Sequence, residues 1–354
     1  MAPIKRKMPT GILILMDILL AGAALCVFAL FHHVLPQAWQ GENITVARPG
    51  SLAISTADPA GASSSPGESS LPDAEISAAA NSDAAISDTA ETAANGSYYA
   101  NFADRFTSTV VSTENTYTSP NVSISVSKEV TGSGSSTITY YIADVYIADI
   151  TQLRTGFAKD TYGKGLRDTL ENMDAFYDAL LSVAGDYYGN HDDGIVIRNG
   201  VVYRSIVTNE DICLLYYDGT METISPQDFD INEVIDKGAW QAWTFGPMLL
   251  DNGQQMTAFN ASSYLMRSHP RTAIGYYEPG HYCFVVIDGR EKGYSSGMTL
   301  SQMSELFATL GCKAAYNLDG GKSAVMVYND NLVNQPADGG RTLSDMVYIS
   351  EVIP

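Results

Sequence analysis

The stretch HYCFVVIDGR, residues 281–290, decides the fold more than any other part of the sequence. Its apolar run shows no polar alternation, which is typical of a central strand in a sheet that is covered on both faces. The run ends in Asp288, Gly289 and Arg290, which a core strand does not require. The stretch therefore predicts a central strand that leads into a polar loop.

A helix and a further strand are predicted downstream. In TLSQMSELFATL, residues 299–310, apolar side chains recur at helical spacing. Thr299 and Gln302 have the spacing of a capping box, and Gly311 ends the pattern as a C-terminal cap would. The segment 313–318, KAAYNL, is a short apolar strand.

Other segments add strands and hairpins. We expect one or two strands in 136–150 and a helix in 169–181. We also expect a hairpin in DGIVIRNGVVYRS, residues 193–205, around Asn199-Gly200, and a second hairpin that turns at Asn329-Asp330. We therefore expect residues 98–354 to form one α+β domain, with a largely antiparallel or mixed sheet core and flanking helices.

The N-terminus carries the pattern of a membrane anchor. The basic residues 5–7 precede an apolar run at 11–31, which is long enough to cross a bilayer core of ~30 Å. We predict a cytoplasmic tail at 1–9 and an uncleaved, single-pass transmembrane signal anchor at 10–34, which places the domain outside the cell membrane. A cleaved signal peptide is the alternative, but no small-x-small cleavage motif follows Phe31.

The composition limits the partners. Residues 35–97 are rich in Ala, Ser, Asp, Gly and Pro, so we predict a flexible linker there. The net charge of -20 argues against nucleic acid or an anionic membrane surface as the main partner. Three cysteines follow the anchor, an odd number that favours buried free thiols and leaves one bridge open: Cys213, Cys283 and Cys312.

A polar hinge interrupts two apolar runs. It is the segment NLDGGKS, residues 317–323, within AAYNLDGGKSAVMVYN. A phosphate-binding P-loop would need glycine where Tyr316 stands, so that motif is excluded. A rigid Asp319 beside two glycines suits a reaction that needs a proton carrier and an anion cradle. The alternative is a strained turn in which Asp319 binds only backbone.

Several segments together resemble the phosphodiester glycosidase family, the family of the lysosomal uncovering enzyme, whose bacterial members are often labelled exopolysaccharide-related. They are SVAGDYYGNHDDGIVIRNG, WTFGPMLLDNG, SHPRTAIGYYEPGHYCFVVIDGR, GMTLSQMSELFATLGCKAAYNLDGGKSAVMVYN and VNQPADGGRTLSDMVYI. They occur in the order of the family, over roughly residues 140–352. The resemblance implies hydrolysis of a sugar-1-phosphodiester at its anomeric carbon, without a cofactor.

The resemblance also implies which residues are catalytic or bind the substrate. It implies Asp319 as acid, base or nucleophile, with Asp288 as a possible second carboxylate. Arg271 and Arg341 are the expected phosphate clamp. The remaining substrate-contacting candidates are Asn317, Gly320, Gly321, Lys322, Ser323, Arg290, Asp186 and Tyr188.

Two departures from the family pattern stand out. Lys322 replaces the third glycine of the hinge, and Asp186 with two tyrosines replaces the usual Asn-Gly and phenylalanines. Metal ligation by His191, Asp192 and Asp193 is disfavoured, since close sequence neighbours rarely converge on one ion, and no metal site is predicted. His191 and His269 are expected to be solvated loop residues.

Two functions from different classes remain open. The first is a membrane-anchored extracellular glycosidase that acts on phosphodiester-linked sugars of an envelope or exopolysaccharide. The second is a catalytically silent glycan-binding module that assists polysaccharide export or assembly. The expected partners are a glycan or sugar-phosphate substrate and, through the N-terminal helix, a membrane. No oligomeric state is predicted.

Overall fold

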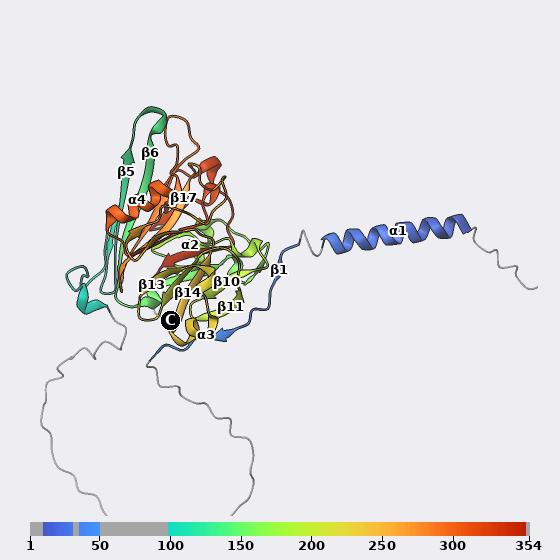
Figure 1. The fold of residues 1–354 in the computed structure, drawn as a ribbon, viewed down its shortest axis with the longest axis horizontal. Coiled ribbons are helices and arrows are strands. Elements are labelled where there is room, and N and C mark those ends of the chain that lie inside the picture. The colour runs from blue at the N-terminus through green and yellow to red at the C-terminus, as the bar shows by residue number, and fades with distance from the viewer. Residues whose placement is uncertain (1–9, 31–34, 50–97, 352–354) are drawn as a thin grey trace, which may run out of the picture.

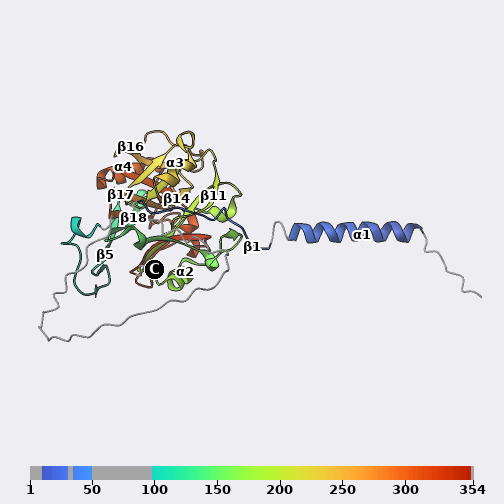
Figure 2. The same cartoon turned by 90° about the horizontal axis from the view of Figure 1, so that it is seen from below.

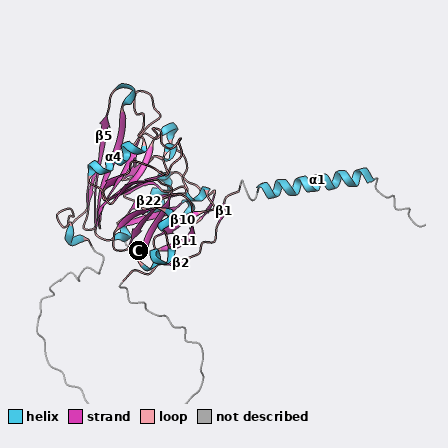
Figure 3. Cartoon of the chain, viewed as in Figure 1, coloured by secondary structure: helices cyan, strands magenta, loops and turns pink. Residues whose placement is uncertain are grey.

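The computed structural model describes residues 10–30, 35–49 and 98–351. Their long strands pair antiparallel, and their helices are few (Figures 1 and 3). The predicted α+β class is confirmed. The structure consists of several sheets packed on one another. The sequence predicted the strands and a largely antiparallel or mixed sheet core, but not the division into several sheets.

The largest sheet has nine strands and contains the segment 281–290 near its middle. In spatial order its strands are β16 (Gln254–Gln255), β15 (Met248–Asp251), β19 (Ala314–Leu318), β17 (Arg271–Glu278), β18 (His281–Ile287), β6 (Ile138–Ile147), β5 (Val122–Thr131), β4 (Thr116–Thr118) and β3 (Val111–Ser112).

Three smaller sheets complete the domain. The six-stranded sheet is ordered β13 (Met221–Ile224), β12 (Ile212–Tyr216), β14 (Ala239–Thr244), β10 (Gly194–Arg198), β11 (Val201–Ile206) and β2 (Ile44–Thr45). The five-stranded sheet is ordered β21 (Asn331–Leu332), β20 (Met326–Tyr328), β9 (Leu181–Ala184), β22 (Asp345–Ile349) and β7 (Leu153–Phe157). The two-stranded sheet pairs β1 (Gln37–Ala38) with β8 (Gly163–Lys164).

The α-helices of the described residues are α1 (Thr10–Ala29), α2 (Leu170–Tyr177), α3 (Ile231–Asp236) and α4 (Leu300–Leu310). Helix α4 has the predicted capping box between Thr299 and Gln302, and Gly311 adopts the left-handed conformation after it. Both predicted hairpin turns are present, because Asn199-Gly200 and Asn329-Asp330 take up positive φ.

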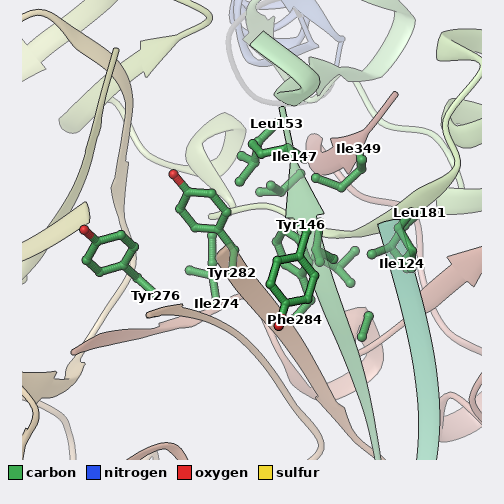
Figure 4. Packing of buried hydrophobic residues seen from close by; sticks show 14 of the residues in the cluster. Ile124, Tyr146, Ile147, Leu153, Leu181, Ile274, Tyr276, Tyr282, Phe284 and Ile349 are labelled. Carbon is green, nitrogen blue, oxygen red and sulfur yellow. The ribbon is translucent and has the colours of Figure 1, made fainter. Parts of the chain in front are cut away.

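The core explains why β18 is apolar along its whole length. Its side chains alternate between two hydrophobic clusters on opposite faces of the sheet. Phe284 contributes to one cluster with Tyr282, while Val285 contributes to the other. Figure 4 shows residues of the first cluster around Tyr282 and Phe284, gathered from strands far apart in sequence. The predicted central, doubly covered strand is confirmed.

The N-terminal part of the predicted linker belongs to the domain. Strand β1 pairs with β8, strand β2 pairs with β11, and Val46 is buried in a hydrophobic cluster. Trp39 packs beside Tyr162. A boundary at residue 98 is therefore wrong for residues 37–46, because a few aromatic and β-branched side chains suffice to anchor an otherwise polar segment. Residues 50–97 of the predicted linker lie outside the described residues.

The predicted anchor coincides with α1, which projects beyond the sheets (Figures 1 and 2). Among the described residues, no helix is long and apolar enough to cross a membrane. The membrane anchor therefore stays a prediction. The predicted cytoplasmic tail, residues 1–9, lies outside the described residues.

Candidate functional site

The hinge lies where β19 ends, on the wall of a pocket of about 320 Å³. We call this cavity the guanidinium pocket, because three arginines line it. It is lined by Phe245, Tyr264, Leu265, His269, Pro270, Arg271, Arg290, Asn317, Leu318, Asp319, Gly320, Gly321, Lys322 and Arg341. The fold thus gathers eight of the predicted site residues around one cavity.

Asp319 is buried and held by two side chains from different elements. Nη2 of Arg341 donates to both carboxylate oxygens, at 2.8 and 2.9 Å. Nε of Arg341 donates to Oγ of Ser323 at 2.5 Å, and Ser323 in turn hydrogen-bonds Asp319. Its backbone N–H donates to the carbonyl of Gly185 at 2.9 Å. Asp319 is therefore fixed in orientation, with only 6% of the residue exposed.

Burial raises the pKa of the Asp319 carboxyl above its ordinary value, because a charged carboxylate loses its hydration there. Arg341 and Ser323 oppose this rise in pKa by stabilising the charged form, while the charge of Asp186 adds to it. A carboxylate with a raised pKa is a better base and nucleophile than an exposed one.

Arg271 anchors a loop that forms one wall of the pocket. Its Nη2 donates to the carbonyls of Leu265 and Arg267, at 2.5 and 2.8 Å, and its Nε donates to Met298 O at 3.2 Å. Burial and the nearby charge of Arg290 lower the pKa of Arg271 to about 10. The lowered pKa means that the positive charge of Arg271 is poorly stabilised by its surroundings, so a bound anion would stabilise it.

Arg290 faces the same pocket. It lies in the left-handed region with φ 63°, and its Nη2 donates to Nδ1 of His269 at 3.2 Å. Since a guanidinium only donates, His269 is the tautomer that accepts at Nδ1 and donates at Nε2 to the carbonyl of Tyr264, 2.9 Å away. His269 is thus buried and bonded, and the expectation of a solvated residue is wrong.

The two guanidiniums are a ready site for an anion. Within the described residues, neither Arg271 nor Arg290 has a carboxylate within ion-pair distance, although both line the pocket. Arg341, by contrast, is already paired with Asp319. The predicted clamp of Arg271 and Arg341 is therefore better described as Arg271 with Arg290.

The glycines of the hinge allow close packing. A Cβ on Gly320 would lie 2.8 Å from the carbonyl oxygen of Pro270, and Gly321 has φ +66°. The N–H of Gly321 already donates to Pro270 O at 2.8 Å, so it does not serve as an anion donor, contrary to our expectation. Lys322 lies at the rim and pairs with Asp338 at 3.0 Å.

Asn317 is bonded on one side only. Its Nδ2 donates to the carbonyl of Gly246 at 2.7 Å, which fixes the orientation of the amide. Its Oδ1 is buried and has no hydrogen-bond partner in the described part of the chain. A lone acceptor of this kind on a pocket wall suits a ligand that brings a donor.

Asp288 is not part of this pocket. Its Oδ1 accepts from Nδ2 of Asn334 at 2.7 Å, and its Oδ2 accepts from the Tyr294 hydroxyl at 2.7 Å and from the N–H of Gln335 at 3.1 Å. Only 1% of Asp288 is exposed. The structure therefore does not bring Asp288 together with Asp319 as a second carboxylate.

Asp186 and Tyr188 line a neighbouring cavity of about 380 Å³, which we call the acidic pocket. Asp186 pairs with the fully buried Arg198 at 2.7 Å, and Arg198 also reaches Asp345 at 3.0 Å. Burial and the charge of Asp186 raise the pKa of Asp345 to about 7. Arg198 thus holds two carboxylates, of which only Asp186 reaches a pocket.

Several of these residues were missed from the sequence. Arg198 in the apolar strand GIVIR did carry a signal, since a lone charge in a buried strand implies a buried partner. Tyr264 and Phe245 carried no signal, because they come from loops whose path only the fold defines. A larger cavity of about 470 Å³ exists near Tyr141 and Tyr328, but none of the predicted site residues line it.

The described residues hold no group of three or more His, Cys, Asp or Glu that could bind a metal ion. The cysteines at 213, 283 and 312 are free and buried, as the composition favoured, with 3.8 Å between the sulfurs of Cys283 and Cys312.

The pocket, its hinge and its arginines lie within the part of the chain that a family profile recognises. Residues 177–350 match the profile of the phosphodiester glycosidase family. These residues form a phosphodiester glycosidase domain. The family description supports a glycosidase-type hydrolase and a glycan-type substrate for this domain.

Individual proteins support the fold of this phosphodiester glycosidase domain. The catalytic domain of zebrafish N-acetylglucosamine-1-phosphodiester alpha-N-acetylglucosaminidase, solved auto-inhibited by its pro-peptide, superposes with a TM-score of 0.53 at 19% identity, over 66% of this chain and 85% of that chain. A hypothetical protein from Synechocystis gives a TM-score of 0.50 at 13% identity, over 65% and 62%.

A relative in sequence is the SPbeta prophage-derived uncharacterized protein YomE of Bacillus subtilis (strain 168), 29% identical over 197 residues. The match covers 53% of this chain but only 30% of YomE.

Proposed function

We propose that the domain hydrolyses a sugar-1-phosphodiester at the anomeric carbon, in envelope or exopolysaccharide metabolism. The observation that carries this proposal is the shared pocket of Asp319 and two guanidiniums without an acidic partner, Arg271 and Arg290. The family description supplies the class of bond.

The roles follow from the charges. Arg290 and Arg271 bind the phosphodiester oxygens, because charge-assisted hydrogen bonds to an anion are strong and neither arginine has an acidic partner in the described residues. Water adds to the anomeric carbon, the bond from that carbon to the phosphate oxygen breaks, and a free sugar and a phosphomonoester result. A phosphomonoester is a weakly basic leaving group, so it does not depend on a proton donor.

Departure of the phosphomonoester therefore needs little help, and the step that needs catalysis is attack on the anomeric carbon from the face opposite the phosphate. Asp319 acts there as the base that activates water, or as the nucleophile that forms a glycosyl intermediate. Arg341 and Ser323 hold the carboxylate in position and keep it charged. Asp186 lines the neighbouring cavity, but it is as buried as Asp288 and already accepts from Arg198 and from the N–H groups of Tyr188 and Thr244, so it is not a free second carboxylate either.

The test uses the full-length chain and a nitrophenyl diester of a hexose 1-phosphate in ¹⁸O-labelled water. We expect the label in the anomeric hydroxyl of the released sugar and nitrophenyl phosphate as the other product. Label in the phosphate would mean that the P–O bond breaks, and the glycosidase assignment would then be wrong.

A catalytically silent glycan-binding module is the second candidate. The observation that favours it is the contact of Arg341 with both oxygens of Asp319, since a paired carboxylate is a weaker nucleophile. Saccharide binding without hydrolysis across a panel of such diesters would support this candidate.

Attachment to the cell membrane through residues 10–34, with the domain outside, is part of the proposal. It rests on the basic residues 5–7 and the apolar run that follows. Protease added to intact cells should digest the domain and leave an N-terminus that begins at Met1 or Ala2. A mature N-terminus between residues 31 and 60 would show cleavage instead.

A further inference from the structure

The acidic pocket adjoins the guanidinium pocket. Phe245 and Leu265 line both cavities, so the two cavities are neighbours. Phe245 belongs to the segment that joins β14 to β15, and Leu265 belongs to the loop that Arg271 anchors. The two volumes are similar, about 320 and 380 Å³.

The chemistry of the two pockets is opposite. Asp186, Asp193 and Glu210 line the acidic pocket, and they disfavour a phosphate there by like-charge repulsion. Arg204 also lines it, but its Nε and Nη1 donate to the carbonyls of Gly194 and His191, at 3.0 and 2.7 Å. The acidic pocket therefore offers carboxylate acceptors, which suit hydroxyl donors, beside the polar side chains of His191, Thr208 and Asn209.

Two of these carboxylates are accessible. Asp193 and Glu210 are exposed, and within residues 98–351 the side chain of neither makes a hydrogen bond or an ion pair. Partial burial, with the charge of Asp211, raises the pKa of Glu210. Both can accept hydrogen bonds from a ligand without breaking an existing one.

A second observation points to a hydroxyl-bearing ligand. The unpartnered Oδ1 of Asn317 needs a donor, and a phosphodiester carries only acceptors. The amide of Asn317 is bonded to Gly246, the residue next to Phe245, which places it close to the shared wall. Asn317 lines the guanidinium pocket and not the acidic pocket, so a sugar hydroxyl meets this need where the two cavities meet, and there the half-buried ring of Phe245 can cover an apolar sugar face.

We propose that the acidic pocket is the saccharide subsite, so that the sugar lies over Asp186, Asp193 and Glu210 while its 1-phosphate lies against Arg271 and Arg290. The inference rests on the proposed function, because it divides that substrate between the two pockets. The anomeric carbon then lies near the shared wall, beside Asp319.

The test compares two double variants of the full-length chain. Asp193→Asn with Glu210→Gln removes the free carboxylates of the acidic pocket. Asp251→Asn with Glu305→Gln makes the same change of charge at exposed residues that line neither pocket. The probes are inorganic phosphate and a panel of hexose and N-acetylhexosamine 1-phosphates, with binding measured by calorimetry.

We expect the best sugar phosphate to bind the unaltered chain at least about tenfold more tightly than inorganic phosphate does. The pocket variant should lose about tenfold or more of this advantage and keep its affinity for phosphate, while the control variant keeps both. An unchanged advantage in the pocket variant, an equal loss in the control, or no advantage in the unaltered chain overturns the subsite.

The outcome is separable from that of the proposed function. If no diester is hydrolysed but the sugar-dependent affinity is lost in the pocket variant, the subsite is supported and the glycosidase reaction is not. If diesters are hydrolysed and the advantage is unchanged, the reaction stands and the subsite falls.

Discussion

Strands β18 and β19 flank β17, and each ends in Asp-Gly at the same edge of the nine-stranded sheet. Asp288 and Asp319 are both almost fully buried, at 1% and 6% exposure, and burial raises both pKa values. Asp288 is surrounded by neutral donors, whereas Asp319 is paired with a cation and borders a pocket.

The difference shows what separates a structural carboxylate from a candidate catalytic one. Asp288 uses its lone pairs to join β18 to the segment around Asn334 and Gln335, so it has little left for a ligand. Asp319 takes its bonds from Arg341 and Ser323 and still lines a cavity that contains unpaired cations. Accessibility and partners, and not burial or pKa alone, distinguish the two.

The largest effect is expected for Asp319→Asn, which keeps the volume and removes the charge. General acid–base catalysis contributes about 10²–10⁴-fold, so kcat should fall by about that factor while the fold persists. Steady-state hydrolysis of the nitrophenyl diester and thermal unfolding measure the two properties. Full activity in a folded variant would mean that Asp319 is not catalytic and that the hinge is only a structural turn.

The matched variant Asp288→Asn should show the reverse. Its new amide group would face donors, leaving one or more of them unpaired, at a cost of about 1–3 kcal/mol in the free energy of unfolding. Urea denaturation measures this loss, and kcat of the remaining folded protein should stay within about twofold. A fall in kcat like that of Asp319→Asn, without loss of stability, would contradict the distinction between the two aspartates.

Asp345 extends the comparison to a buried carboxylate that shares Arg198 with Asp186. Its pKa rises from 3.8 to about 7 on folding, so its contribution to stability is present below about pH 3.8 and is lost as the pH rises through about 7. Asp345→Asn removes this dependence. The difference in unfolding free energy between the unaltered chain and the variant should change by up to about 1.4 kcal/mol per pH unit in that window.

Urea titrations of both proteins at several pH values between 4 and 7.5 would measure this. Parallel pH profiles would mean that Asp345 does not bind a proton in this range in the folded state.

The smallest effect is expected for Lys322→Gly, which restores the glycine of the family pattern. Lys322 is 46% exposed and paired with Asp338, and such surface pairs contribute only about 0–1 kcal/mol. KM for the diester should rise by less than about fivefold, and less at high salt. A larger, salt-sensitive rise would place Lys322 among the phosphate-binding cations with Arg290.

The sequence predicts those parts of the structure that short-range rules determine. The cap of α4 and both hairpin turns depend on residues within a few positions of one another, and the apolar run of β18 defines its own burial. The hinge was recognised as unusual because charges and glycines interrupt an apolar pattern. The same rules failed for residues 37–46, where polar composition concealed the few side chains that dock on the domain.

The sequence by itself determined the α+β class, the central strand, the resemblance to the family and the candidate Asp319. The tertiary structure alone decided which aspartate borders a cavity, which arginines lack an acid, and that two pockets share a wall. The physical reason is that partners and accessibility arise from contacts between residues far apart in the chain. Arg341 reaches Asp319 across 22 residues, and Asn334 reaches Asp288 across 46, and no local pattern encodes either contact.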